Sequence, residues 1–498
     1  MNANLYALFR AHFGERMDAP CILLPDRRAI TYGELDAASA RFSHALLATG
    51  ARPGDRVAVQ VEKCWEALAL YLACLRAGLV YLPLNTAYQK SELSYFFGDA
   101  EPAIIVGRPD AAPLHAALRP QATVFTLGAG EGTLQDSERD QSEDFNPARS
   151  APDDLAAILY TSGTTGRAKG AMLSHRNLAS NALTLVERWG FVHDDVLLHA
   201  LPLYHVHGLF VACHCALLSG ARMLWYGKFD ARTVIAALPR ATVMMGVPTF
   251  YSRLLAEPDF GVDACRTIRL FVSGSAPLLP ATFDEFAQRT GQAILERYGM
   301  TETGMNTSNP LVGERRCGSV GLPLPGISAR VVHANGEPCA PGEVGSIQVK
   351  GPNVFSGYWR MPEKTAEEFT ADGYFKTGDM GEMMSDGYLR IVGRAKDLII
   401  TGGLNVYPKE VEERIDALAG VVESAVIGVP DADFGEGVTA VIVAAKGSTL
   451  TEAGVIAQLK SEIAGFKVPK RVHFVADLPR NAMGKVEKNV LRQRYGAR

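Results

Sequence analysis

Residues 160–170, with the sequence YTSGTTGRAKG, combine residue types that bind anions. Three glycines, four serine or threonine hydroxyls and one lysine lie within these eleven residues. Glycines let backbone N–H groups approach phosphate oxygens closely, and the lysine adds a positive charge. The stretch is not a P-loop, because counting from Gly163 places Ala168 at the second glycine and Gly170 at the hydroxyl position. We therefore expect phosphate chemistry that does not need the magnesium-binding hydroxyl of a P-loop.

Two buried strands are expected to position this stretch and a second group of small residues. Residues 155–160 (LAAILY) and 269–274 (RLFVSG) are short apolar runs, and glycine or serine follows each of them. Such runs, alternating with helical patterns, predict an α/β fold with largely buried parallel strands. Ligands of open α/β sheets bind at the carboxyl ends of strands. The two strand ends therefore predict one ligand site.

Composition limits the class of protein. A chain of 498 residues predicts about two to four domains. An apolar content of 47% and a charged content of 21% are typical of folded proteins and argue against disorder. The formal net charge of −4 gives no reason to expect nucleic acid as a partner.

Targeting signals and cysteine usage favour a cytoplasmic protein. Residues 65–84 are apolar, but Glu66, Arg76 and Pro83 indicate a buried helix followed by a strand rather than a membrane span. The first twenty residues lack a basic segment followed by an apolar run, so we expect no signal peptide. The eight cysteines form no CxxC pair, which predicts reduced thiols. Residues 109–120 (PDAAPLHAALRP) are interpreted as a surface connection.

The last hundred or so residues predict a small α/β domain of their own. Pro408 is expected to open a helix that carries Val411, Ile415 and Leu418 on one face. Thr449 and Glu452 predict a capping box for a second helix, which bears Val455, Leu459 and Ile463. We expect residues 1–394 to form the large domain and residues 395–498 the small one, with a hinge near residues 393–397.

Five motifs stand in an order that resembles the adenylate-forming enzymes, the superfamily of acyl-CoA synthetases, peptide-synthetase adenylation domains and luciferases. They are YTSGTTGRAKG, YGMTE (298–302), TGD (377–379), GRAKDLIITGGLNVYPKEVE (393–412) and PRNAMGKVEK (479–488). Segments such as LPLYHVHGLF (201–210), GVPTFYSRLL (246–255) and ERYGMTETGMNTSNP (296–310) more closely resemble the malonyl-CoA synthetases within it. The resemblance implies a large N-terminal domain of stacked α/β sheets and a small, mobile C-terminal α/β domain.

The resemblance also implies a reaction that explains the opening motif. The family converts a carboxylate into an acyl-AMP with release of diphosphate, so a loop must wrap the departing phosphates of ATP. The acyl-AMP is then attacked by the thiol of CoA. Mg²⁺ is expected on Glu302, and Thr301 is expected to touch the α-phosphate. The remaining residues implied at the nucleotide are Thr161, Ser162, Gly163, Thr164, Thr165, Lys169, Ser273, Gly274, Ser275, Ala276, Glu296, Arg297, Tyr298, Gly299, Asp379 and Arg394.

Lys485 matches the family lysine that bridges the substrate carboxylate and the α-phosphate, where its charge offsets the repulsion between two anions. The resemblance places Gly402 and Gly403 beside the CoA thiol arm, on the opposite face of the small domain from Lys485. The small domain is therefore expected to rotate between the two half reactions, with Lys396 as the hinge residue.

A dicarboxylic acid such as malonate needs a fixed cation, because burying its second carboxylate unpaired would cost several kcal/mol. The planar guanidinium of arginine suits a carboxylate. The candidates are Arg253 in GVPTFYSR and Arg269 before LFVSGSAP, and Arg253 is preferred. The resemblance adds His207, Ser275, Met300 and Met305 to the acid site.

Three classes of function stay open at this point. The first is a ligase that joins malonate, and also methylmalonate, to CoA. The second is a CoA ligase for another short acid such as acetate or propionate, or a ligase that loads a carrier protein instead of CoA. The third is a nucleotide-binding module without catalysis, which Lys485 and Glu302 together argue against.

Overall fold

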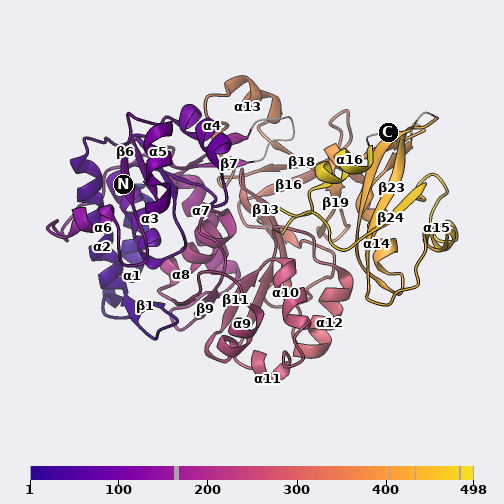
Figure 1. The fold of residues 1–498 in the computed structure, drawn as a ribbon, viewed down its shortest axis with the longest axis horizontal. Helices are drawn as coiled ribbons and strands as arrows, with labels where there is room; N and C mark the ends of the chain where they lie inside the picture. Colours follow the sequence, from indigo (N-terminus) through magenta and orange to yellow (C-terminus); the bar gives the residue numbers. More distant parts are fainter. Residues whose placement is uncertain (1, 162–167, 403, 432, 482–483, 497–498) are drawn as a thin grey trace.

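A computed structural model of the chain describes residues 2–161, 168–402, 404–431, 433–481 and 484–496. The described residues form four sheets, three in the large N-terminal domain and one in the small C-terminal domain (Figure 1). This arrangement confirms the predicted α/β fold with a large and a small domain. The 3₁₀ helix η5 (Ala395–Asp397) lies between the last strand of the large domain and the first strand of the small one. The proposed boundary after residue 394 falls at this position and stays a prediction.

The first sheet has six strands, which are parallel except for the antiparallel pair β7 and β8. In spatial order they are β6 (Thr123–Thr126), β5 (Ile104–Gly107), β3 (Arg56–Gln60), β4 (Val80–Pro83), β7 (Leu155–Thr161) and β8 (Lys169–Ser174). The predicted strand at residues 155–160 is therefore confirmed as β7. One face of the sheet packs against α4 (Lys90–Ala100) and α5 (Ala112–Leu118). Residues 109–120 connect β5 to β6 near the surface as expected, and they also form α5, which turns His115 inward to Gln60.

The second sheet has nine strands and is parallel through its centre. In spatial order they are β15 (Leu322–Pro323), β14 (Gly304–Ser308), β13 (Leu295–Met300), β12 (Leu270–Ser273), β11 (Val243–Gly246), β9 (Val196–His199), β10 (Arg222–Trp225), β1 (Pro20–Leu23) and β2 (Ala29–Thr31). The strand predicted at residues 269–274 is confirmed as β12. The two predicted strand ends therefore belong to different sheets.

Helices fill the space between and around these two sheets. One continuous core contains residues of both sheets together with helices α1 (Leu5–Phe13), α2 (Tyr32–Ala48), α3 (Trp65–Ala77), α7 (His175–Arg188) and α8 (His214–Ser219). Every residue of α3 after Trp65 is buried, which confirms that this apolar stretch is a core helix followed by the strand β4. No described helix is long and apolar enough to cross a membrane. The far face of the nine-stranded sheet is covered by α9 (Ala231–Ala237), α10 (Pro248–Leu255), α11 (Val262–Cys265) and α12 (Pro280–Thr290).

A four-stranded antiparallel sheet completes the large domain and leads into the small one (Figure 1). Its strands are β16 (Ser328–Val332), β17 (Val344–Lys350), β18 (Phe375–Met383) and β19 (Leu389–Arg394). The helix α13 (Pro362–Glu368) lies between β17 and β18 in the chain. This sheet carries the TGD motif on β18 and ends at Arg394, so it brings both to the edge where the small domain begins.

The small domain has a five-stranded sheet and three helices among its described residues. The strands are β20 (Ile399–Thr401), β21 (Leu404–Val406), β22 (Val421–Asp431), β23 (Gly435–Ala444) and β24 (Arg471–Val475), and the helices are α14 (Pro408–Asp416), α15 (Glu452–Lys460) and α16 (Lys488–Gly496). Pro408 opens α14 as predicted, with Val411, Ile415 and Leu418 buried. The predicted cap of α15 was wrong: the N-cap is Thr451, whose side chain accepts from the N–H of Gly454, because it stands directly before the helix.

Candidate active site

A cavity of about 590 Å³ lies where the two large sheets and the small domain meet. Thr161, at the end of β7, and Ser275, just beyond β12, both line it, so the two strand ends face one space although they belong to different sheets. The small domain contributes Lys485. The sequence-predicted residues that line the cavity are Thr161, Lys169, His207, Ser275, Arg297, Gly299, Met300, Thr301, Glu302, Met305, Arg394 and Lys485.

Arg297 is a buried cation without a protein partner for most of its nitrogens. It lies on β13 with 4% of its surface exposed, and neither Nε nor Nη2 has a hydrogen-bond partner. Burial lowers the pKa of Arg297 to about 10, so the guanidinium stays charged at neutral pH. Gly274 makes room for it, since a Cβ at that position would collide with the guanidinium carbon. A buried, unsatisfied charge inside a cavity is a place for an anionic ligand.

Two further polar atoms without partners belong to His207, which lines the cavity, and to Ser273, on the strand that pairs with β13. The Nε2 atom of His207 and the Oγ atom of Ser273 are buried and have no hydrogen-bond partner. Burial and the charge of Arg297 hold the pKa of His207 well below its usual range, so its ring is neutral. A neutral imidazole can donate a hydrogen bond to a carboxylate. Arg297 and His207 therefore suit a polar, negatively charged substrate end.

The backbone around these groups has uncommon conformations. Ser275 has a φ of +73°, a left-handed value that serine seldom adopts, and its Oγ lies 3.4 Å from Nδ1 of His207. His207 begins the π-helical segment η3 (His207–Cys213). Strained residues and π-helical turns are typical of functional sites. Both features hold His207 and Ser275 against the cavity.

The residues that the sequence predicts around adenosine include an ion-paired cluster. The hydroxyl of Tyr298 donates to Asp379, and Nε of Arg394 lies 2.7 Å from the same carboxylate. The Thr377 hydroxyl accepts from the N–H of Asp379 and fixes the turn of the TGD motif. Burial, followed by the neighbouring Asp379, raises the pKa of Tyr298, so the phenol remains protonated. A carboxylate held in this way can accept hydrogen bonds from ribose hydroxyls.

Glu302 projects a carboxylate into the same cavity from the segment after β13. Its Oε1 atom accepts from the hydroxyl of Tyr358 at 3.1 Å and lies 3.4 Å from Oγ1 of Thr161. Burial raises the pKa of Glu302, which indicates a carboxylate that would gain from a bound cation. Lys169 lies over the ring of Tyr358, with its Nζ 3.4 Å from Glu368. Glu302, Thr161 and Lys169 thus place a carboxylate, a hydroxyl and an ammonium group on the same cavity.

Lys485 reaches the cavity from a loop of the small domain. Gly484, the preceding residue, has a φ of +72°, and a Cβ placed there would lie 3.2 Å from Oγ1 of Thr249 on α10. The loop therefore rests directly on the large domain. The lysine retains solvent contact through the cavity, yet the surrounding protein, and then the charge of Arg394, lower its pKa to about 8. His205 lies near it, and burial followed by the charge of Lys485 lowers the pKa of His205 to about 3.

The structure places the predicted acid-binding arginine, Arg253, outside the cavity. Arg253 lies on the exposed face of α10 and does not line the cavity, so the assignment of a buried carboxylate to it is corrected. An exposed guanidinium loses most of an ion pair to solvent screening. Arg297 is an arginine of the cavity lining with two unpaired buried nitrogens, although the sequence suggested it only for the nucleotide. The signal that could have found it is a charged residue at the end of the buried run AILERYG.

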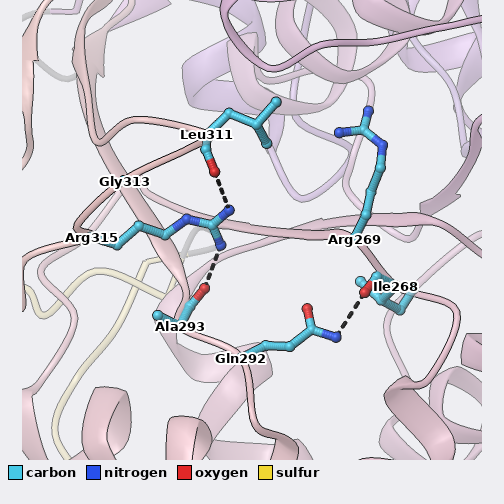
Figure 2. Close-up of a pocket in the computed structure, with 7 residues that line it drawn as sticks. All are labelled: Ile268, Arg269, Gln292, Ala293, Leu311, Gly313 and Arg315. Carbon is cyan, nitrogen blue, oxygen red and sulfur yellow. Dashed lines mark hydrogen bonds between the residues drawn. The ribbon is translucent and has the colours of Figure 1, made fainter.

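The second candidate, Arg269, has a structural role. It makes a two-pronged ion pair with Asp195, at 2.8 and 2.6 Å, and donates to the carbonyls of Trp189 and Gly190. Figure 2 shows it beside a separate hollow of about 390 Å³, with its guanidinium turned away from Gln292 and Arg315. This hollow lies before the first residues of β12 and β13, at the opposite end of the strands from the site.

Other predicted residues lie near the cavity or apart from it. Glu296 is turned away: it accepts from the N–H of Gly318, and burial raises its pKa to about 7. Gly402 is exposed on the small domain with a φ of +57°, and Lys396 lies in η5. The structure does not place Ser273, Gly274, Ala276, Tyr298 and Asp379 among the lining residues. Ser162, Gly163, Thr164, Thr165 and Gly403 lie outside the described residues.

Known proteins share this architecture over the whole chain. The AMP-binding enzyme family matches residues 9–359, and the AMP-binding enzyme C-terminal domain matches residues 410–485. The crystal structure of ATP-bound MatB from Rhodopseudomonas palustris is 56% identical, covers 100% of this chain and 99% of its own, and superposes with a TM-score of 0.97. The apo structure of the same MatB covers the chains equally, with a TM-score of 0.87.

Two curated relatives are more distant. A feruloyl-CoA synthase from an Amycolatopsis species is 38% identical over 472 residues, which cover 94% of each chain. A mitochondrial malonate–CoA ligase, ACSF3 from Bos taurus, is 35% identical over 526 residues, which cover 97% of this chain and 89% of the relative. By the match to the family and by these relatives, the chain belongs to the AMP-binding enzymes, which form adenylates.

Proposed function

We propose that this chain is an AMP-forming ligase that joins malonate to CoA through malonyl-AMP. The observation that carries the proposal is Arg297, a buried guanidinium with free nitrogens in the same cavity as Lys485. A monocarboxylic acid would leave this charge unpaired once its one carboxylate is turned toward ATP. A short dicarboxylic acid places its distal carboxylate on Arg297 and its reacting carboxylate within reach of Lys485. Two relatives of this chain, from Bos taurus and Arabidopsis thaliana, bear the name malonate–CoA ligase, which agrees with this choice.

In the first half reaction, an oxygen of the reacting carboxylate attacks the α-phosphorus of ATP. A carboxylate–phosphorus bond forms, the bond from the α-phosphorus to the bridging oxygen breaks, and diphosphate leaves with the electron pair. No general base is needed, because the carboxylate is already ionised. Lys485 contributes a positive charge between two anions that must approach each other. Tyr298, Asp379 and Arg394 would hold the adenosine, with Asp379 accepting from the ribose.

Mg²⁺ would be held by Glu302. The fit rests on a carboxylate that is buried in the cavity and whose pKa is raised by that burial, beside the hydroxyl of Thr161. Oxygen donors of this kind are the ligands that Mg²⁺ prefers. When bound, the ion would neutralise charge on the phosphate oxygens.

In the second half reaction, the thiol of CoA attacks the acyl carbon, the bond to AMP breaks, and the thiol proton passes to solvent. In the structure the loop of Lys485 rests on α10 and occupies one side of the cavity. CoA needs a route to the acyl-AMP, so we propose that the small domain rotates about Lys396. Rotation would bring Gly402 and Gly403 to the thiol arm.

The test is the release of AMP and the formation of thioester with a panel of acids, each as sole substrate, with and without CoA. The panel contains malonate, methylmalonate, acetate, propionate and ferulate. Malonate should give the highest kcat/KM, because it alone among the unbranched acids pairs both Lys485 and Arg297. A higher kcat/KM for propionate or ferulate would show that this acid, and not malonate, is the preferred substrate. The proposed ligase reaction would stand unchanged.

A further inference from the structure

We propose that the hairpin between β16 and β17 holds a zinc ion, on His333, Cys339 and Glu343. Among the residues that the structure describes, these three are the group of His, Cys, Asp or Glu side chains whose ligand atoms all lie within 4.8 Å of one another. They come from one connection of eleven residues in the large domain. None of them lines the ATP cavity, and the ligase reaction does not use them.

The backbone of the hairpin holds the three side chains in place. The N–H of His333 donates to the carbonyl of Glu337 at 2.8 Å, and the N–H of Cys339 donates to the carbonyl of Val331 at 3.0 Å. The N–H of Glu343 donates to the carbonyl of Ala340 at 3.0 Å. The carboxylate of Glu343 accepts from the N–H of Ala340, also at 3.0 Å. The hairpin is therefore ordered by its own hydrogen bonds, and the ligands do not have to be gathered from a flexible loop.

A glycine leaves room for the sulfur. Cys339 packs over Gly345, where a Cβ would lie only 2.5 Å from Sγ. Any larger residue at position 345 would push the sulfur out of the group. Cys339 is a free thiol, and it lies only partly buried. The sulfur is thus both held and accessible.

The chemistry of the three donors selects the ion. An imidazole nitrogen, a thiolate and a carboxylate oxygen are the ligand types of Zn²⁺, whereas Mg²⁺ and Ca²⁺ take oxygen donors. One thiolate and one carboxylate balance the two charges of the ion. Nε2 of His333 already lies 3.4 Å from Oε2 of Glu343, and their side chains are 39% and 48% exposed. A fourth position therefore opens to solvent and would be filled by water.

Binding is a simple exchange of a proton for a metal bond. The S–H bond of Cys339 breaks, its proton goes to the buffer, and a bond forms between sulfur and Zn²⁺. His333 binds as the neutral imidazole, and Glu343 as the carboxylate. The ligands are three rather than four, so we expect a site that is specific but weaker than a closed structural zinc site.

The experiment measures metal binding by the full-length chain after treatment with EDTA and gel filtration. Zn²⁺ is titrated in competition with a chromophoric chelator, and Co²⁺ is used separately as a spectroscopic probe. The wild type should bind one equivalent of Zn²⁺, and its Co²⁺ form should absorb in the near ultraviolet through sulfur-to-cobalt charge transfer. Cys339→Ser should abolish this band, and Cys339→Ser and His333→Gln should each weaken Zn²⁺ binding at least about tenfold.

Two matched controls exclude adventitious binding. Cys317→Ser removes an exposed thiol elsewhere, and His193→Gln removes an exposed histidine that is likewise paired with a carboxylate, Asp194. Both variants should still bind one equivalent of Zn²⁺, and their Co²⁺ forms should keep the charge-transfer band. Unchanged Tm values and adenylation rates would show that the hairpin variants are folded. The proposal is overturned if the wild type binds no equivalent of Zn²⁺, or if Cys339→Ser binds it as tightly as the wild type does.

Discussion

The two sides of the cavity are built in different ways. The large-domain side is formed by His207, at the start of a π-helical segment, by Ser275, just beyond β12, and by Arg297 on β13. His207 and Arg297 are buried, and Ser275 is partly buried. The small-domain side is Lys485, on a loop that touches α10 at Thr249 and keeps solvent contact. A buried, preorganised side can discriminate among acids, because its polar groups are costly to leave unpaired. A residue on a separate domain, such as Lys485, can move out of the cavity when that domain rotates. It is therefore suited to one half reaction and not to the other.

The largest effect should come from Lys485, on the small-domain side of the cavity. Lys485→Ala is expected to slow acyl-AMP formation by roughly a thousandfold, because it removes the positive charge positioned where two anions must approach each other. Thioester formation from supplied malonyl-AMP and CoA should change little, because the lysine acts in one domain orientation only. The two half reactions are measured separately, by ATP–diphosphate exchange and by CoA consumption. Equal losses in both would show that Lys485 is not confined to one step.

The large-domain side should control the selectivity among acid substrates. Arg297→Ala leaves the distal carboxylate of malonate unpaired, at a cost of about 3–5 kcal/mol, so kcat/KM for malonate should fall a hundredfold or more. Propionate has no distal carboxylate, so its kcat/KM should fall little or rise. The matched control is Arg253→Ala, an exposed arginine, which should keep the wild-type preference. If instead Arg253→Ala loses the preference for malonate and Arg297→Ala keeps it, the correction made from the structure is wrong.

A smaller effect is expected from a substitution at Lys396, at the junction between the two domains. Lys396 lies in the 3₁₀ helix η5, whose backbone angles proline tolerates, so Lys396→Pro should fit the observed orientation and hinder rotation. Adenylation should survive, and CoA transfer should fall about tenfold or more, as for other conformational steps that limit turnover. Lys396→Ala is the control for loss of the side chain alone. A parallel fall in both half reactions of the proline variant would place the pivot elsewhere.

The smallest effect is a pH dependence of the adenylation rate that arises from Lys485. The pKa of Lys485 is lowered to about 8, and its useful form is the protonated one, which is present below that pKa. Adenylation kcat/KM should therefore be level near pH 7 and fall as the pH rises through 8, reaching about a tenfold loss one unit above the pKa. Lys485→Arg keeps its charge across this range, so its profile should lack this fall. A wild-type profile that stays level to pH 9 would contradict the role of the charge.

The sequence predicted single elements better than their assembly. β7, β12, α3 and α14 follow from apolar runs and a helix-opening proline, which are local signals. That β7 and β12 belong to different sheets depends on long-range pairing, which no short stretch encodes. The preference for Arg253 over Arg269, with Arg297 assigned only to the nucleotide, has a related cause. Arg253 and Arg297 both lie beside recognisable motifs, and the burial that distinguishes them is a property of the folded chain.

The contact between Gly484 and Thr249 offers a covalent lock. A Cβ at residue 484 would lie 4.0 Å from the Cβ of Thr249, a separation that a disulfide spans without moving the backbone. Cysteine at both positions would cost roughly 1–2 kcal/mol at residue 484, because of its left-handed φ. Once oxidised, such a variant would make malonyl-AMP and hold it, and a reductant would release the domain to CoA. One engineered bond would thus convert a continuous catalytic cycle into two steps that an experimenter starts separately.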